Sequence, residues 1–311
     1  MQLQQLGYFV AVAETRHFTR AAARLNVAQP SLSQQIRALE EDLGERLFER
    51  SPGNIALTAA GETLLPLARR ILADAETVRS EIRDLGELRR GRVRLGATPS
   101  LCTGLLPPIL SDFRAQFPGL QLQVHEGGSR DLERELAQGG IELALVTSTH
   151  QTLSNPALTT TPLLIEELVV VSQLGQPRPV PRRRMTVAEL QGQSLVMFRE
   201  GYDLREFTVA ACRDAGFEPS FAIEGGEMDA VLGFVTAGLG IAVVPSTVVG
   251  DRLRVTPFTA PGLSRTISLA QRRDAELPRA SQALADGITD YLARAEASGT
   301  LPSRTYPACP A

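Results

Sequence analysis

Apolar positions in the first 58 residues predict three short helices followed by two small strands. The third helix is expected from Gln29 to Leu43, because Pro30 suits a first helical turn and Gly44 suits the left-handed residue that ends a helix. Its buried stripe has helical spacing and consists of Leu32, Ile36, Leu39 and Leu43. Earlier helices are expected near residues 3–13 and, capped by Thr19, at residues 20–25. With strands at 47–50 and 55–57, the pattern predicts a winged helix-turn-helix.

A single long helix is predicted from Thr58 to about Leu88. Its apolar positions are separated by alternating steps of four and three residues, which is the heptad spacing of a coiled coil. They are Leu64, Ala68, Ile71, Ala75, Val78, Ile82 and Leu85. Charged residues occupy the other faces, so we favour a dimerisation seam over packing on the chain's own domain, which remains the alternative.

Strand and helix patterns alternate from about residue 91 to residue 298. Continuous apolar runs such as 142–146, 195–198 and 241–244 predict buried strands, and helical patterns separate them. This is an α/β pattern, and we expect two lobes with a cleft between them. The expected domains are a winged helix-turn-helix at 1–58, a linker and dimerisation helix at 59–89, a two-lobed domain at 90–298 with crossovers near 162 and 267, and a disordered tail at 299–311.

The composition excludes several kinds of chemistry. The chain has 311 residues, 43% of them hydrophobic, and all 32 of its basic residues are arginine against 35 acids. Without lysine it can form neither a Schiff base nor a P-loop. The net charge of -3 argues against binding to nucleic acid by bulk charge, although one small domain could still bind DNA. Three isolated cysteines and three histidines without ligand spacing predict no metal and no cofactor.

No apolar run is long enough to span a membrane, and the N-terminal residues do not resemble a secretory signal. We therefore expect a cytoplasmic protein with no membrane partner.

Several segments resemble the LysR-type transcriptional regulators. Residues 21–36 (AAARLNVAQPSLSQQI) and 39–50 (LEEDLGERLFER) resemble the helix-turn-helix of that family. Residues 57–61 (LTAAG) resemble its entry into a linker helix, and residues 237–245 (AGLGIAVVP) resemble a run in its effector domain. The resemblance implies sequence-specific binding to double-stranded DNA, a periplasmic-binding-protein-like effector domain, a small-molecule effector, and homodimers that pair into a homotetramer.

Candidate DNA-contacting residues lie on and around the third predicted helix. Six arginines and six acids cancel over residues 1–58, so geometry must concentrate the positive charge. Glutamine can bond adenine and arginine can bond guanine from a helix in the major groove. The candidates are Arg20, Gln29, Pro30, Ser31, Ser33, Gln34, Arg37 and Arg50. The alternative that Ser33 and Gln34 are merely solvated stays open. Unlike many members of the family, the wing has no second basic residue after Arg50.

Candidate effector contacts follow several predicted strands of the α/β domain. Thr98-Pro99-Ser100 stands between a strand and a helix, where amides and hydroxyls favour an anion. By resemblance, the other loops line the same cleft and supply Ser129, Thr147 and, as an apolar wall, Phe198 or Tyr202. We predict a small anionic effector between the lobes. Ordinary caps and turns remain an equal alternative for these residues.

Two alternative functions stay open. Cys102 lies in the first helical turn after Ser100, where a helix N-terminus lowers a thiol pKa, so a redox-responsive regulator is one alternative. A small-molecule-binding module without DNA binding is the other alternative. An enzyme is not expected, because no GxSxG, HExxH or GxGxxG motif occurs.

Overall fold

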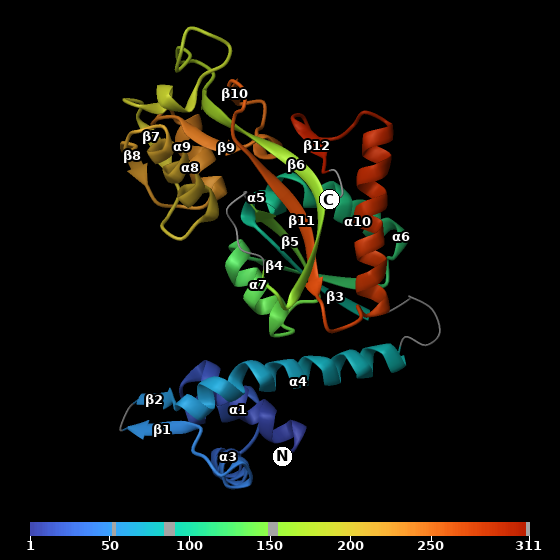
Figure 1. Ribbon diagram of the computed structural model, residues 1–311. Coiled ribbons are helices and arrows are strands. Elements are labelled where there is room, and N and C mark those ends of the chain that lie inside the picture. The colour runs from blue at the N-terminus through green and yellow to red at the C-terminus, as the bar shows by residue number, and fades with distance from the viewer. Residues whose placement is uncertain (52–53, 84–90, 149–154, 309–311) are drawn as a thin grey trace. The chain divides into compact units, whose positions relative to one another are not determined.

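The structure is a computed structural model that describes residues 1–51, 54–83, 91–148 and 155–308 (Figure 1). The chain forms two compact units, Met1–Gly86 with Ala137–Gly140, and Glu87–Leu136 with Ile141–Ala311, and each is described by itself. Within the described segments, no helix combines the length and the apolar character that crossing a membrane requires.

The N-terminal unit is a winged helix-turn-helix followed by a long helix. Its elements are α1 (Leu3–Thr15), α2 (Phe18–Arg24), α3 (Gln29–Leu43), β1 (Phe48–Ser51), β2 (Asn54–Leu57) and α4 (Ala59–Arg83). The predicted bounds of α3 are confirmed, and Gly44 ends the helix at a φ of 74°. The prediction that Thr19 caps α2 is wrong: His17 is the cap, and its Nδ1 accepts a hydrogen bond from the Thr19 N–H at 3.2 Å.

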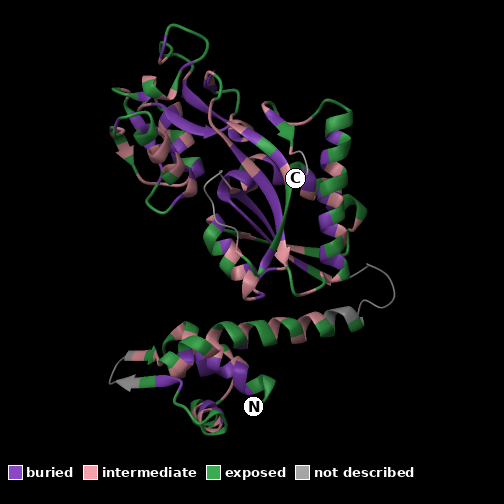
Figure 2. Cartoon of the chain, viewed as in Figure 1, coloured by how far each residue is buried: buried purple, intermediate pink, exposed green. Residues whose placement is uncertain are grey.

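One apolar core holds the N-terminal unit together (Figure 2). It combines the inner faces of three helices and the wing, through Leu6, Phe9, Val12, Ala21, Leu32, Ile36, Leu39, Phe48 and Ala68. Leu43, predicted to complete the stripe of α3, is 41% exposed because it lies in the last turn, past the neighbouring helices. The Thr58 hydroxyl accepts a hydrogen bond from the Gly61 N–H at 3.1 Å and thereby caps α4.

Lobe 1 of the C-terminal unit contains a mixed sheet in the order β4, β3, β5, β11, β6. Strands β3 (Gly91–Ala97), β4 (Leu120–Glu126) and β5 (Leu143–Ser148) are parallel, whereas β11 (Ser264–Arg272) and the first part of β6 (Leu158–Gln173) are antiparallel to their neighbours. The helices of this lobe are α5 (Pro99–Gly104), α6 (Leu106–Gln116), α7 (Ser129–Ala137) and α10 (Arg279–Ala297). The carboxyl ends of parallel strands lie at the same edge of a sheet. The loops that follow β3, β4 and β5 therefore lie close together.

Lobe 2 is built on the second part of β6. Here β9 (Ala242–Pro245) and β10 (Leu253–Pro257) pair with β6, and β7 (Leu195–Met197) pairs with β8 (Phe221–Glu224). The helices are α8 (Asp203–Asp214), α9 (Met228–Thr236) and the 3-10 turns η1 (Val187–Leu190) and η2 (Ser246–Val248). Its core is separate from that of lobe 1, which agrees with the expectation of two lobes.

Two chain crossovers join the lobes. Strand β6 pairs with β11 as far as Glu167 and with β9 from Leu168 onwards, and the chain returns to lobe 1 between β10 and β11. The sequence placed these crossovers near 162 and 267, a few residues from where the strands change partners. Because β6 runs through both lobes, it connects them as one continuous element (Figure 1).

The prediction of a disordered tail is wrong for the described residues 299–308. Strand β12 (Thr305–Pro307) is antiparallel to β6, opposite Leu164 to Glu166. The Arg304 side chain pairs with Glu167 at 3.0 Å, and the Tyr306 hydroxyl donates to the same carboxylate at 3.0 Å. The proline-rich composition hid this short strand, because the edge of β6 satisfies its backbone groups. Residues 309–311 lie outside the described part.

Candidate functional site

The outer face of α3 is polar and accessible, as predicted. Gln29, Pro30, Ser31, Gln34 and Arg37 are exposed, and Ser33 is half-buried. The Gln29 Nε2 donates a hydrogen bond to the Ser33 Oγ at 2.9 Å, one helical turn along the same face. On the opposite face, Leu32, Ile36 and Leu39 belong to the core of the N-terminal unit. The helix therefore offers one continuous polar face to a partner.

Two arginines border this face without partners. Arg20 on α2 and Arg37 on α3 are exposed, and neither makes a hydrogen bond or ion pair to a residue in the described segments. Arg24, by contrast, pairs with Glu14 at 2.8 Å. The backbone of Arg50 lies in β1 opposite Ile55, but its side chain lies outside what the structure describes. Two guanidinium groups are thus available for an anionic partner.

Two of the acids on α3 are turned away from that face. The Glu40 carboxylate accepts from the Leu47 N–H at 2.9 Å and the Phe48 N–H at 3.3 Å, and so fastens the wing to α3. Asp42 pairs with the Met1 amino group at 2.6 Å. Both carboxylates are therefore engaged in contacts within the N-terminal unit.

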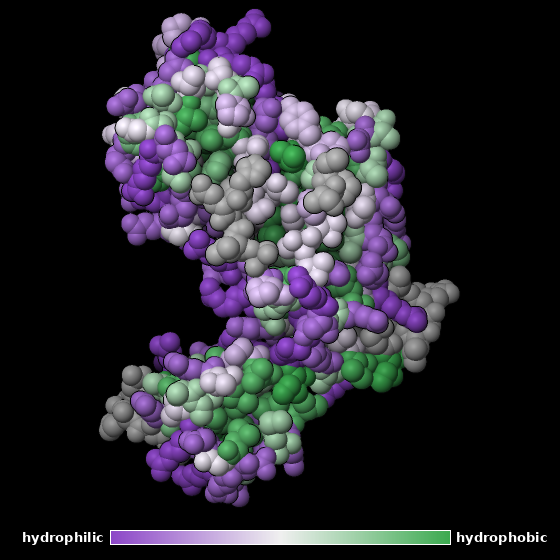
Figure 3. Space-filling view, in the orientation of Figure 1, coloured by the Kyte–Doolittle hydropathy of each residue, from purple (hydrophilic) through white to green (hydrophobic). Residues whose placement is uncertain are grey.

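The predicted heptad seam of α4 divides into two parts. Ala68 is fully buried in the core of the N-terminal unit and Leu64 packs against that core, so these two residues face their own domain. Ile71, Val78 and Ile82 are 37%, 57% and 64% exposed, and Figure 3 shows apolar atoms gathered along this helix. Ala75 is half-buried, and Leu85 lies outside the described residues.

The assignment of Leu64 and Ala68 to a dimer seam is therefore not supported. The first half of α4 lies on α1, which already occupies that part of the stripe. The second half leaves a row of large apolar side chains exposed to water. Such a row is typical of a surface that a second helix covers.

A small cavity lies between the lobes and gathers most of the predicted effector residues. It has a volume of about 10 Å³ and is lined by Thr98, Pro99, Ser100, Gly128, Thr147, Tyr202, Asp203, Leu204 and Arg265. A space of this size holds about one water molecule. A ligand larger than water therefore needs more space between these residues than the cavity has here.

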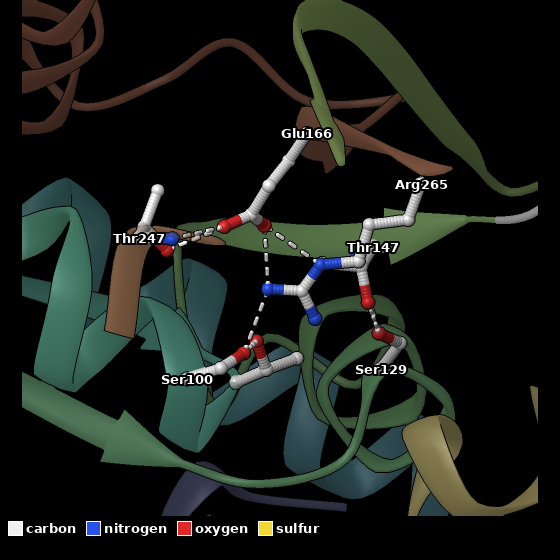
Figure 4. A network of polar contacts seen from close by, with 7 residues as sticks. Ser100, Ser129, Thr147, Glu166, Thr247 and Arg265 are labelled. Carbon is white, nitrogen blue, oxygen red and sulfur yellow. Dashed lines mark hydrogen bonds and ion pairs between the residues drawn. The ribbon is translucent and has the colours of Figure 1, made fainter. Parts of the chain in front are cut away.

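Arg265 is the central charged group of this cavity, and the sequence analysis missed it. Its guanidinium is 3% exposed and pairs with the fully buried Glu166, with Nη2 and Oε2 2.8 Å apart (Figure 4). The same Nη2 donates to the Ser100 Oγ at 2.9 Å. Glu166 in turn accepts from the Thr247 N–H at 3.0 Å. The network fixes one edge of the guanidinium, while Nη1 makes no hydrogen bond within the described segments.

A second hydrogen-bonded group connects the two lobes. The Ser129 Oγ accepts from the Thr147 N–H at 3.1 Å, and the Ser129 N–H donates to the Asp203 Oδ2 at 3.0 Å. Asp203 begins α8 of lobe 2, whereas the other two residues belong to lobe 1. Ser129 itself lies directly behind the cavity rather than in its lining.

The structure separates the two aromatic candidates. Tyr202 lines the cavity, but Phe198 does not; it stacks behind Tyr202 with ring centroids 4.6 Å apart and planes 7° from parallel. Phe198 as a direct wall of the site is therefore wrong, and it supports Tyr202 instead. The buried Tyr202 hydroxyl has no hydrogen-bond partner among the described residues. Burial raises the pKa of Tyr202, so its hydroxyl stays protonated.

The cysteine environment opposes a redox role. Cys102 is half-buried, and burial together with the neighbouring Glu126 raises the pKa of its thiol to about 11. This is opposite to the lowering expected from a helix N-terminus. Burial raises the pKa of Cys212 to about 11 as well. In the part of the chain that the structure describes, no group of three His, Cys, Asp or Glu residues could hold a metal ion.

A larger cavity of about 350 Å³ lies elsewhere, along β6 and β10. Its lining combines Val169, Leu253 and Val255 with Asp251 and with Arg304, which already pairs with Glu167. Size alone does not identify a binding site. The smaller cavity between the lobes gathers convergent hydroxyls, an arginine and a carboxylate, and it is the better candidate.

The residues that sequence reasoning missed carried a detectable signal. Glu166 and Arg265 lie within strand patterns that are otherwise apolar or small, LLIEELVVV and SRTISLA. A charged residue in such a strand is buried only with a partner, so each predicts an unidentified counter-charge. The pairing itself spans 99 residues of sequence and could not be read from spacing.

Comparison with known proteins gives two family matches. Residues 3–62 match "Bacterial regulatory helix-turn-helix protein, lysR family", and residues 86–293 match "LysR substrate binding domain". The chain is 31% identical over 297 residues to a hydrogen peroxide-inducible genes activator of Dickeya chrysanthemi, covering 94% of this chain and 96% of that protein. It is also 31% identical over 300 residues to the transcriptional dual regulator GltC of Bacillus subtilis (strain 168), covering 95% and 99%.

A solved structure gives the same result at the level of the fold. Full-length CbnR complexed with its target DNA has a TM-score of 0.67 and 25% sequence identity, covering 93% of this chain and 99% of that chain. The two chains therefore share the order of a helix-turn-helix, a long helix and a mixed α/β domain over the matched 93% of this chain.

Proposed function

Because the chain belongs to the LysR family of transcriptional regulators, as the two family matches show, we propose that it reads DNA with α3, dimerises through α4 and responds to a carboxylate effector between its lobes. It is a DNA-binding regulator with an effector domain, and not an enzyme. The single observation that carries the proposal is the polar, arginine-bordered face of α3, opposite a fully buried apolar face.

DNA recognition uses the exposed side chains of α3 in the major groove. Gln34 and Arg37 have the donors and acceptors that read base edges, while Arg20 and the first turn of α3 contact phosphates. The rest of the contact surface on α3 is formed by Gln29, Pro30, Ser31 and Ser33. In the wing, Arg50 contacts a phosphate. Among the described residues, the guanidinium groups of Arg20 and Arg37 have no ion-pair partner, so DNA binding breaks no ion pair that the structure describes, which supports this assignment.

Dimerisation uses the second half of α4. The exposed Ile71, Val78 and Ile82, with Ala75 between them and Leu85 beyond, continue the heptad spacing past the part that packs on α1. Two such helices side by side deliver two DNA-binding domains to half-sites about one turn of DNA apart. The pairing of such dimers into a homotetramer follows the pattern of the family.

Effector binding uses the cavity between the lobes. The hydroxyls of Thr98, Ser100 and Thr147 and the free Nη1 of Arg265 are donors suited to a carboxylate. The effector requires the lobes to separate, because the present cavity holds about one water. It therefore has different affinities for two lobe arrangements, which is the condition for a ligand to shift a conformational equilibrium. A change in lobe geometry then alters the spacing of the DNA-binding domains.

Replacing Arg37 by alanine tests the proposal. We expect specific DNA affinity to fall by roughly 1–3 kcal/mol, or about 5- to 150-fold. The measurement is a fluorescence anisotropy titration of the full chain with the promoter fragment upstream of its own gene. Arg24→Ala is the matched control, since Arg24 is also exposed but engages Glu14, and it should change affinity little. Unchanged affinity for Arg37→Ala would remove Arg37 from the DNA-binding site.

A further inference from the structure

The inter-lobe cavity contains acceptors as well as donors, and a plain anion leaves these acceptors unused. Lobe 1 contributes the donors Thr98, Ser100, Thr147 and Arg265, and lobe 2 contributes the Asp203 carboxylate. The Asp203 Oδ2 accepts from the Ser129 N–H, whereas Oδ1 makes no hydrogen bond to a described residue. Gly128 lies beside this Oδ1, since a Cβ at position 128 would be 4.0 Å from it.

Tyr202 gives a second, independent indication of a missing group. Its side chain is 5% exposed and lines the same cavity, yet its hydroxyl has no partner among residues 1–51, 54–83, 91–148 and 155–308. Buried hydroxyls are nearly always hydrogen-bonded in folded proteins. Stacking on Phe198 fixes the ring, so the hydroxyl cannot turn freely towards another partner. A ligand in the cavity that bonds this hydroxyl would satisfy it.

The charge around the cavity is unfavourable for a molecule that is only negative. Arg265 is already neutralised by Glu166. Asp203 adds to burial in raising the pKa of Glu133 on α7, and Glu227 and Asp229 of lobe 2 do the same for Glu126 at the end of β4. Arg130 beside Glu133 and Arg199 paired with Glu227 offset only part of this charge. A positive group on the ligand would compensate Asp203.

We propose that the effector is a small zwitterion, with a carboxylate bound by Ser100, Thr147 and Arg265 and an ammonium group bound by the Asp203 carboxylate and the Tyr202 hydroxyl. The inference rests on the proposed effector site and specifies the class of ligand that it takes. Three N–H donors on one ammonium match two acceptors and leave one for water. The carboxylate donors belong to lobe 1 and Asp203 and Tyr202 belong to lobe 2, so one such ligand contacts both lobes, which links this ligand class to lobe movement.

The test is a thermal-shift screen of the full chain with the twenty protein amino acids, β-alanine and 4-aminobutyrate. Each amino acid that binds is then measured by isothermal titration calorimetry beside its deaminated acid and its decarboxylated amine. We expect at least one zwitterion to bind 10-fold or more tightly than both matched analogues. No binding by any amino acid in the panel would overturn the inference.

Variants assign the recognition to named groups. Asp203→Asn keeps the size of the side chain and should reduce the preference for the zwitterion over its deaminated acid to less than 3-fold. Tyr202→Phe removes only the hydroxyl, and it should weaken binding of the zwitterion more than binding of its deaminated acid. Glu206→Gln, an exposed acid on the same helix, is the control and should leave both affinities unchanged. Circular dichroism and retained binding to promoter DNA confirm that each variant is folded.

The outcomes separate this inference from the proposed function. If deaminated acids bind as tightly as amino acids and Asp203→Asn changes neither, the site takes carboxylates only; the proposed function then stands and the zwitterion is wrong. If amines bind as tightly as amino acids, the carboxylate subsite is wrong, and both the zwitterion and the carboxylate effector of the proposed function fail. If Asp203→Asn loses the preference for the zwitterion but still binds the deaminated acid, the result supports both the zwitterion and the proposed effector site.

Discussion

The outer face of α3 and the cavity between the lobes represent two ways of building a binding site. The first comes from one helix, where Gln29, Ser33 and Arg37 follow each other at successive turns and need no distant partner. The second comes from segments as far apart as Ser100 and Arg265, which are 165 residues apart in sequence and joined by a 2.9 Å hydrogen bond. A site on one helix depends on local periodicity, whereas a site between lobes depends on the whole fold.

The difference predicts different responses to substitution. Side chains on the outer face of α3 can be removed without disturbing the core beneath them. In the cavity, the side chains that shape the site also hold the lobes together, because Glu166 bonds both the Arg265 guanidinium and the Thr247 backbone. Substitutions there should affect stability and ligand response together.

The largest effect is expected for Glu166→Ala. Removing the carboxylate leaves the buried Arg265 charge unpaired, which should destabilise the C-terminal domain by about 3–5 kcal/mol. Guanidinium unfolding of the full chain, followed by circular dichroism, measures this loss. Arg294→Gln, which breaks the surface pair with Asp112, should cost less than about 1 kcal/mol. A loss no larger than that control would show that the pair does not hold the lobes.

The next effect concerns the two halves of α4. Val78→Glu places a charge in the exposed apolar row of both chains and should weaken dimerisation by about 3 kcal/mol, or more than 100-fold. Sedimentation equilibrium measures the dimer dissociation constant. Thr77→Glu introduces the same group outside the heptad stripe and should have little effect. Equal dissociation constants for the two variants would contradict a seam along the second half of α4.

A smaller effect is expected at Cys102, and it depends on pH. A thiol with a pKa of about 11 is mostly protonated at pH 8.5, where a free cysteine is about half ionised. Alkylation by iodoacetamide should therefore be roughly 100-fold slower than for free cysteine, and should accelerate only as the pH approaches 11. Mass spectrometry of a Cys309→Ser chain follows the reaction. Rapid alkylation at pH 7 would revive a redox role.

The site on α3 could be predicted from the sequence more completely than the cavity between the lobes. The bounds of α3, its buried stripe up to Leu39 and its polar face follow from helical periodicity, and the structure agrees. Thr98 and Ser100 could be predicted because they stand in a turn between a strand and a helix, and Thr147 and Tyr202 because the loops that carry them resemble those of the family. Arg265 and Asp203 were missed because they enter the cavity from a crossover strand and from the other lobe.

Two errors have a common physical cause. Ala68 and Leu64 fit the heptad pattern, but α1 covers that part of α4, and spacing alone does not say which partner covers an apolar stripe. The proline-rich tail looked unable to pack, but the free edge of β6 accepts it as β12. In both cases a non-local partner decided the outcome.

The central claim is that the N-terminal domain delivers the chain to specific DNA. The most direct test is an anisotropy titration of the intact chain, and of a chain lacking residues 1–58, with the promoter fragment upstream of its own gene and with a scrambled fragment of equal length. The account predicts that the intact chain binds the promoter at least 100-fold more tightly than the scrambled fragment, and that the shortened chain binds neither. Equal binding of both fragments, or binding that survives the deletion, would contradict it.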